Sequence, residues 1–190
     1  MNPAQADAPH SATAAQSAVV RLLDAIAFAA ERHRAQRRKD EEASPYINHP
    51  IALATLLAGS AGVEDVAVLQ AAVLHDTIED TDTTAEELRA RFGPEVAAIV
   101  MAVTDDPSLD KARRKELQVE RAAQASREVA LVKWADKICN LRDMSSAPPA
   151  GWSIERRREY FHWAKRVVDR LPQVSPALRA AFDAAYAAIP

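Results

Sequence analysis

Apolar residues recur at helical spacing through most of this chain, and no segment sustains the apolar–polar alternation that is typical of a strand. Near the start of the chain, Val19, Leu22, Leu23 and Ile26 illustrate the helical pattern. The chain has only 4 glycines, whereas alanine and the straight-chain residues, which lose little conformational entropy in a helix, are abundant. These features predict an all-α fold.

The length of 190 residues and the apolar content of 48% predict one domain with a substantial core. Residues 1–17 lack the basic start and apolar run of a signal peptide, so we expect a disordered N-terminal tail before a domain over residues 18–190. No apolar run is long enough to suggest a membrane span.

The formal charge of −3 provides no overall attraction to nucleic acid or to an anionic membrane. The single cysteine, Cys139, fits a cytoplasmic location because it cannot form an internal disulfide.

A helix predicted over residues 64–80 ends in four ionisable side chains with no intervening Lys or Arg. These side chains are His75, Asp76, Glu79 and Asp80. At about 100° per residue all four fall on one face, while Leu74 and Ile78 point to the opposite side, where a core would receive them. Three neighbouring carboxylates repel one another. A divalent cation is the simplest missing partner.

Two residues elsewhere in the chain are further candidate ligands, although their spacing alone does not select them. His49 precedes Pro50 at the start of a predicted helix. Asp136 lies in a Lys-rich helix, with Asn140 four residues later on the same face. A histidine beside a proline is more often structural, and an aspartate among lysines more often forms an ordinary ion pair. The residue pattern therefore leaves both interpretations open.

An ordered set of motifs resembles the HD-domain phosphohydrolases, in which a His, a distant His–Asp doublet and a further distant Asp bind a metal. Longer segments resemble the hydrolase domain of RelA/SpoT-type enzymes, and especially the MESH1-like small alarmone hydrolases, which are single-domain guanosine-3′,5′-bis(diphosphate) 3′-pyrophosphohydrolases. The resemblance extends over residues 19–171. Its segments are residues 37–39, 45–50, 74–81, 103–106, 117–120, 135–137, 140–143 and 160–161, with Trp163.

This resemblance implies a single HD-domain helical fold and a small-molecule nucleotide substrate. It also implies that Glu79 and Asp80 drive hydrolysis of the 3′-pyrophosphate of (p)ppGpp to GDP or GTP and pyrophosphate. Nitrogen and oxygen ligands without thiolates suit an ion such as Mn²⁺, which makes hydroxide accessible near neutral pH. The implied metal ligands are His49, His75, Asp76 and Asp136. The implied substrate-binding residues are Arg38, Lys39, Asn140, Arg156 and Tyr160.

Several alternatives remain open from the sequence. The same chemistry fits (p)ppApp or NADPH as the preferred substrate, and a non-catalytic alarmone-binding module would retain binding without hydrolysis. Without the resemblance, the acidic pair and the basic segments would be solvated helix surfaces. Trp134 and Cys139 replace a leucine and an aromatic residue that are usual in the family, and we expect them to reshape the pocket wall. The apolar pattern does not decide whether the chain forms a homo-oligomer.

Overall fold

The structure, a computed structural model, describes residues 10–190, with side chains from residue 18 onward. Within that range every regular element is a helix, and the β pairing is limited to one isolated bridge between Arg37 and Pro45. The prediction of an all-α fold is confirmed. None of the described helices is long and apolar enough to cross a bilayer. In chain order they are α1 (His10–Arg32), α2 (Asn48–Gly59), α3 (Val66–Leu74), α4 (Thr77–Asp80), α5 (Ala85–Phe92), α6 (Pro94–Val103), α7 (Lys111–Arg121), the 3₁₀ helix η1 (Ala122–Gln124), α8 (Arg127–Ser146), α9 (Ile154–Val168) and α10 (Pro176–Tyr186).

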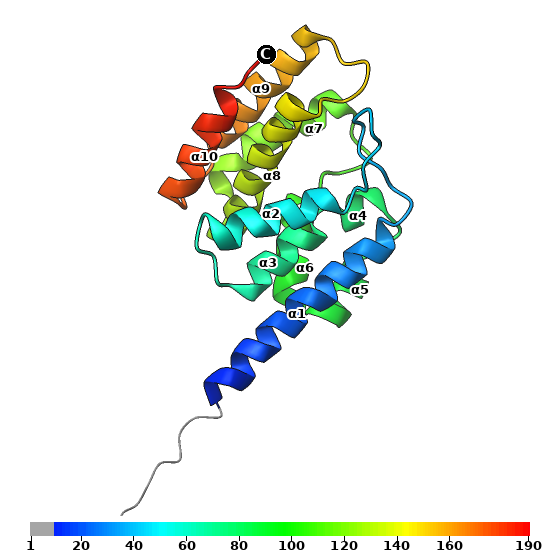
Figure 1. Ribbon diagram of the computed structural model, residues 1–190, viewed down its shortest axis with the longest axis vertical. Coiled ribbons are helices and arrows are strands. Elements are labelled where there is room, and N and C mark those ends of the chain that lie inside the picture. The colour runs from blue at the N-terminus through cyan, green and yellow to red at the C-terminus, as the bar shows by residue number, and fades with distance from the viewer. Residues whose placement is uncertain (1–9) are drawn as a thin grey trace, which may run out of the picture.

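Helix α3 forms the centre of the core. Every residue from Ala67 to Leu74 is buried, and the helix packs against α1, α2, α6 and α8. Figure 1 shows α1 along one side of the molecule and α9 with α10 along the other, with α2, α3 and α8 between them. The most deeply buried helix therefore leads directly into His75.

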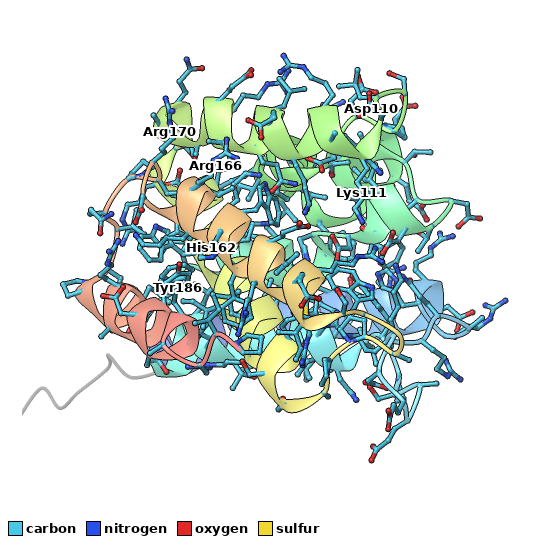
Figure 2. The ribbon with its side chains drawn as sticks, turned by 90° about the horizontal axis from the view of Figure 1, so that it is seen from above. Asp110, Lys111, His162, Arg166, Arg170 and Tyr186 are labelled. Carbon is cyan, nitrogen blue, oxygen red and sulfur yellow. The ribbon has the colours of Figure 1, made fainter. Side chains whose placement is uncertain are left out.

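Helix α9 lies between α7 and α10 when the molecule is seen from above (Figure 2). On one side, Arg166 Nη2 is 2.8 Å from Glu116 Oε2 of α7. On the other, His162 Nδ1 is 3.0 Å from the hydroxyl oxygen of Tyr186. The indole of Trp163 also donates a hydrogen bond to the backbone oxygen of Lys115 at 3.1 Å. Helix α9 thus braces α7 and is itself contacted by α10.

Helix α1 begins earlier than the sequence predicted. Residues 1–9 of the expected tail lie outside the described residues, but the helix already begins at His10. Alanine, which has the highest helix propensity, is frequent over the first turns. These turns project beyond the other helices in Figure 1, and Val19, Val20 and Leu23 farther along the helix are exposed. The start of the domain at residue 18 stays a prediction from the sequence.

The helix predicted over residues 64–80 is interrupted at the His–Asp doublet. Helix α3 ends at Leu74 and α4 begins at Thr77, and Asp76 between them has φ −99° and ψ 0°. The hydroxyl of Thr77 donates to the backbone oxygen of Leu74 at 2.7 Å, which satisfies a carbonyl at the end of α3. The prediction of one continuous helix with four ionisable groups on one face was wrong, because the helical ladder breaks before the acidic pair.

Helix α5 begins at an N-cap threonine. The Oγ1 atom of Thr84 accepts a hydrogen bond from the backbone nitrogen of Glu87 at 3.1 Å. Thr84→Ala is expected to lower the free energy of unfolding by about 1 kcal/mol, because one helix-terminal amide loses its acceptor. Urea denaturation measures this loss. Thr55→Ala, at an exposed position of α2, is the matched control and should change the free energy of unfolding by less than about 0.5 kcal/mol. If both variants lost the same free energy of unfolding, Thr84 would not act as a cap.

Candidate functional site

Four side chains from α2, α8 and the α3–α4 break meet at one point. His49 Nε2 is 3.4 Å from Asp136 Oδ1, and His75 Nε2 is 4.0 Å from the same oxygen. Asp76 Oδ2 is 2.9 Å from His75 Nε2. Ligand atoms of the two histidines and Asp136 all lie within 4.8 Å of one another. The structure therefore brings together the four residues that the family resemblance implied as metal ligands.

His75 supplies a test of whether a cation fits this point. Its Nδ1 lies 3.0 Å from the backbone oxygen of Ala72, which assigns the ring proton to Nδ1. Its Nε2 is buried, has no hydrogen-bond partner among the described residues and faces Asp76 and Asp136. Burial lowers the pKa of His75, but the two aspartates outweigh it and raise this pKa to about 9. A nitrogen lone pair facing two carboxylates needs a proton or a metal ion between them.

The carboxylate of Asp136 is fixed from two directions. Oδ2 accepts a hydrogen bond from Lys137 Nζ at 2.8 Å, and Oδ1 accepts one from Asn140 Nδ2 at 2.5 Å. Burial raises the pKa of Asp136, but Lys137 and His49 lower it well below its usual value. Burial also raises the pKa of Asp76, and the two histidines bring it down to about 2. Two ionised carboxylates and two imidazoles match the ligand chemistry of a divalent cation.

Tyr46 and Lys137 contact two of the candidate ligands, and the sequence did not single them out. The hydroxyl of Tyr46 donates a hydrogen bond to Asp76, as Lys137 does to Asp136. Burial raises the pKa of Tyr46, and the charge of Asp76 raises it further, so the phenol remains a donor. Hydrogen bonds of this kind to a carboxylate fix the direction in which its free oxygen lone pairs point, and so orient it as a metal ligand. Both residues stand within motifs quoted for the family resemblance, but spacing does not show where their side chains point.

The two acidic residues of α4 line different cavities. Glu79 lines a central cavity of about 170 Å³ together with the four candidate ligands, whereas Asp80 lines a larger neighbouring cavity. Glu79 accepts a hydrogen bond from the backbone nitrogen of Asp105 at 3.3 Å, and Arg114 Nη1 lies 3.5 Å from its other oxygen. Burial raises the pKa of Glu79, which favours a group that accepts a proton. Asp80 accepts a hydrogen bond from Gln36 Nε2 at 2.8 Å.

The larger cavity has a volume of about 610 Å³ and combines basic, amide and aromatic side chains. Arg38, which lines both this cavity and the central one, pairs with Asp143 and lies 5.8 Å from the centre of the Tyr46 ring. The other basic residues that line the larger cavity are Arg37, Lys39 and Lys111. Four of the five predicted substrate-binding residues line it, namely Arg38, Lys39, Asn140 and Tyr160.

Arg156, the fifth predicted substrate-binding residue, is exposed and does not line this cavity. Its guanidinium carbon lies 4.0 Å from the ring centre of Trp152, which does line the cavity. Lys111 Nζ lies 5.8 Å from the same ring. Arg156 therefore backs the cavity wall. Trp152 and Lys111 had no sequence signal, because Trp152 lies in the loop before α9 and contacts residues distant in the chain.

Trp134 and Cys139 do not reshape these cavities, so that expectation was wrong. Neither residue lines the central or the larger cavity. Trp134 packs edge-on against Phe182 of α10 at 5.9 Å and donates to the backbone oxygen of Pro172 at 3.1 Å. Burial raises the pKa of Cys139 to about 12, so its thiol is a neutral packed group.

Comparison with known proteins adds an independent line of evidence. Residues 25–162 match the family model described as HD domain. Two relatives, from Danio rerio and Homo sapiens, are named guanosine-3′,5′-bis(diphosphate) 3′-pyrophosphohydrolase MESH1, and each is 54% identical to this chain. The Danio rerio match covers 83% of this chain and the Homo sapiens match covers 82%; each covers 87% of the relative's own length. A solved structure described as a metazoan ortholog of SpoT that hydrolyzes ppGpp has a TM-score of 0.85 at 43% identity, covering 96% of this chain and 97% of that one.

Proposed function

The chain belongs to the HD-domain family, and from that premise we propose that it hydrolyses the 3′-pyrophosphate of (p)ppGpp to GDP or GTP and pyrophosphate. The observation that carries this proposal is the convergence of His49, His75, Asp76 and Asp136 in a cavity that Glu79 also lines. The names of the relatives and the adjoining basic cavity support the nucleotide substrate. The domain is proposed to span residues 18–190.

We propose Mn²⁺ as the metal, held by the two histidines and the two aspartates. A bound divalent cation would polarise a phosphoryl oxygen and lower the pKa of water. The set of nitrogen and oxygen ligands without a thiolate favours Mn²⁺ and related ions over a structural zinc. Tyr46 and Lys137 would keep the aspartates in place, because each donates a hydrogen bond to one of them.

Glu79 is proposed as the general base. It lies in the central cavity, and the backbone of Asp105 and the guanidinium of Arg114 hold its carboxylate there. The water oxygen bonds to the phosphorus attached to the ribose 3′ oxygen, and Glu79 takes the water proton. The bond between that phosphorus and the 3′ oxygen breaks with its electron pair on oxygen, so pyrophosphate leaves intact. The 3′ oxygen takes a proton from solvent water to become the hydroxyl of GDP or GTP, and Glu79 returns its proton to solvent. Asp80 is proposed to act on the nucleotide side, because it lines the larger cavity.

The larger cavity is proposed to bind the nucleotide. Arg38 and Lys39 supply positive charge for the phosphates, Asn140 supplies an amide, and the Tyr160 ring supplies a surface for the base. Arg156 is proposed to support this surface through Trp152. We propose a cytoplasmic location and no nucleic-acid partner, as the sequence predicted. Whether the chain associates with itself stays open.

Incubating the purified protein with ppGpp and Mn²⁺ is expected to release GDP and pyrophosphate in equal amounts, measured by ion-exchange chromatography. The same protein stripped of metal with EDTA is the control and should release neither. Comparing kcat/KM for ppGpp, ppApp and NADPH ranks the substrates, since selectivity is a difference in transition-state binding. Binding of ppGpp without any GDP at micromolar enzyme would instead favour the non-catalytic alarmone-binding module.

A further inference from the structure

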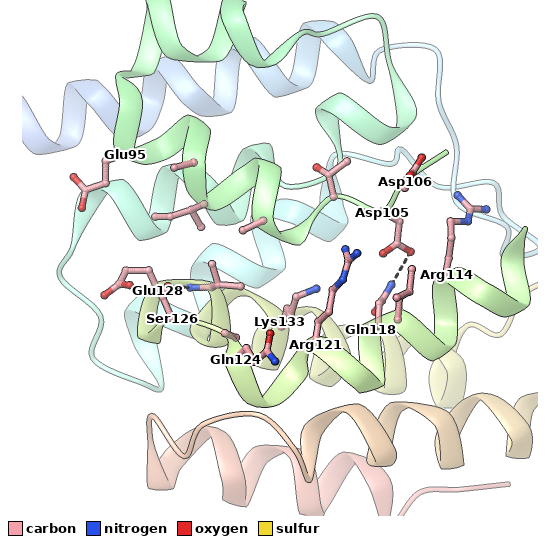
Figure 3. A pocket seen from close by; sticks show the side chains of 17 residues that line it. Glu95, Asp105, Asp106, Arg114, Gln118, Arg121, Gln124, Ser126, Glu128 and Lys133 are labelled. Carbon is pink, nitrogen blue, oxygen red and sulfur yellow. Dashed lines mark hydrogen bonds between the residues drawn. The ribbon is translucent and has the colours of Figure 1, made fainter. Parts of the chain in front are cut away.

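The segment that follows α1 carries a buried histidine that the proposed reaction does not use. His33 is 2% exposed, and its backbone nitrogen donates to the backbone oxygen of Ala29 at 2.9 Å, so it continues the last turn of α1. It lines neither the central nor the larger cavity. It also lies outside a third cavity, of about 560 Å³, whose lining side chains come largely from α6, α7 and α8 (Figure 3). Any effect of His33 on a nucleotide must therefore pass through a neighbouring side chain.

The neighbour that His33 contacts through a ring nitrogen is Gln36. His33 Nδ1 is 2.6 Å from Gln36 Oε1, and Gln36 Nε2 donates a hydrogen bond to Asp80 Oδ2 at 2.8 Å. Because a carboxylate only accepts hydrogen bonds, the amide nitrogen must face Asp80 and the amide oxygen must face His33. Nδ1 is then the donor and carries the ring proton. The three side chains form one hydrogen-bond network that ends on Asp80.

The backbone of Gln36 is held in place for this network. Its nitrogen donates to the backbone oxygen of His33 at 2.9 Å, and its oxygen accepts from the backbone nitrogen of Tyr46 at 3.2 Å. The isolated bridge between Arg37 and Pro45 lies directly beside this second contact. With the backbone fixed, the remaining freedom lies in the side chain, and the hydrogen bond from His33 decides which way the amide faces.

The Asp80 carboxylate has little other support. Asp80 is exposed and belongs to α4, a helix of only four residues. Among the side chains of residues 18–190, Gln36 is the one that donates a hydrogen bond to this carboxylate. An exposed side chain without a partner samples several rotamers, and ordering it when a ligand binds costs free energy. The Gln36 amide removes part of this cost because it holds the carboxylate beforehand.

The His33 ring has a second contact, with Tyr46. The two ring centres are 4.8 Å apart, and the Tyr46 hydroxyl donates a hydrogen bond to Asp76. This contact is packing between rings and does not use the Nδ1 proton. His33 Nε2 is buried and has no hydrogen-bond partner among the described residues. Substitutions that move the donor therefore separate the Gln36 contact from the packing.

We propose that His33 is a positioning residue for nucleotide binding, which orients the Gln36 amide so that Asp80 is held in place at the larger cavity. This inference rests on the proposed function, in which Asp80 acts on the nucleotide side. Both Gln36 and Asp80 line that cavity, whereas His33 supports them from the protein interior. Loss of the His33 donor should therefore weaken nucleotide binding and leave the chemical step intact.

Steady-state kinetics with ppGpp at saturating Mn²⁺ test this role through two amide substitutions of the same histidine. The amide nitrogen of an asparagine reaches the position of Nδ1, whereas that of a glutamine reaches the position of Nε2. His33→Asn should therefore keep KM within about twofold of the wild type, and His33→Gln should raise it about fivefold. In both variants kcat should change by less than about twofold. His162→Gln, at an exposed position of α9 outside the three cavities, is the matched control and should leave both constants unchanged.

The order of the two His33 variants distinguishes positioning from packing. Asparagine is smaller than glutamine and removes more of the contact with Tyr46, so a packing role would make His33→Asn the more damaged variant. Equal KM values in the two variants, or the larger rise in His33→Asn, would overturn the proposal. So would a loss of kcat with unchanged KM, which is the signature of a smaller folded fraction.

A second substitution tests whether the effect passes through Asp80. In an Asp80→Ala background the end of the network is gone, so His33→Gln should raise KM no further. Gln36→Leu, which removes both hydrogen bonds at a half-buried position, should likewise raise KM in the wild type and not in Asp80→Ala. This pair tests the network even if the His33 variants fail to fold. A rise of the same size in both backgrounds would show that the network does not act on Asp80.

The tautomer of His33 is a test that needs no substrate. Two-bond proton–nitrogen NMR correlations of the isotope-labelled protein should show the ring proton on Nδ1, in the signals that disappear in His33→Asn. A ring protonated at Nε2 alone would overturn the network, because Gln36 would then have no donor. Failure of the proposed function is seen separately, as wild-type protein that forms no GDP from ppGpp while its His33 still carries the proton on Nδ1.

Discussion

Glu79→Gln is expected to lower kcat for ppGpp by about 10²- to 10⁴-fold, because the amide cannot accept the proton of the attacking water. The substitution keeps the size of the side chain, and the amide oxygen can still accept the hydrogen bond from the backbone of Asp105. The larger cavity is untouched, so KM should change little. Steady-state kinetics at saturating Mn²⁺ measure both constants.

Two further variants make the Glu79 result specific. Glu86→Gln, at an exposed position of α5, removes the same charge away from the cavities and should leave kcat unchanged. Asp80→Asn should raise KM more than Glu79→Gln does, because Asp80 lines the nucleotide side. A kcat within threefold of the wild type in Glu79→Gln would rule out this glutamate as the general base.

The second large effect is expected at Asp136, whose replacement by Asn should weaken Mn²⁺ binding by about 100-fold or more. The amide has nearly the shape of the carboxylate but lacks the charge that balances the cation. The Oδ1 atom is the carboxylate oxygen that lies 3.4 Å from His49 and 4.0 Å from His75, so the lost charge is central to the site. Calorimetric titration of the metal-free protein with Mn²⁺ measures the change, and activity should return only partly at millimolar metal.

Asp183→Asn on α10 is the matched control for Asp136→Asn. Its carboxylate is exposed and pairs with Arg179 at 3.2 Å, away from the three cavities. Mn²⁺ affinity should be the same as in the wild type. If the two variants bound Mn²⁺ equally well, Asp136 would not be a ligand, and the ion pair with Lys137 would be its whole role.

The helical fold was predictable because apolar periodicity depends on local geometry. The interruption at Asp76 was not. At this break the Asp76 carboxylate accepts a hydrogen bond from Tyr46, thirty positions earlier in the chain, and such a contact is absent from the local pattern. His49 and Asp136 were named only through the family resemblance, because neither has a neighbour in sequence that marks it as a ligand. The cavity of about 560 Å³ between α6, α7 and α8 left no trace in the sequence, since residues that line it, such as Gln118 and Lys133, belong to different helices.

The burial of α3 has a consequence for how the protein responds to its surroundings. Because every residue from Ala67 to Leu74 is enclosed, His75 cannot leave its place unless the core opens. A cation that binds only the closed arrangement shifts the folding equilibrium, and each tenfold rise in free ion above its Kd adds about 1.4 kcal/mol to stability. The resistance of this protein to heat should therefore follow the free metal concentration around it, and the melting temperature should keep rising after the buried site is already full.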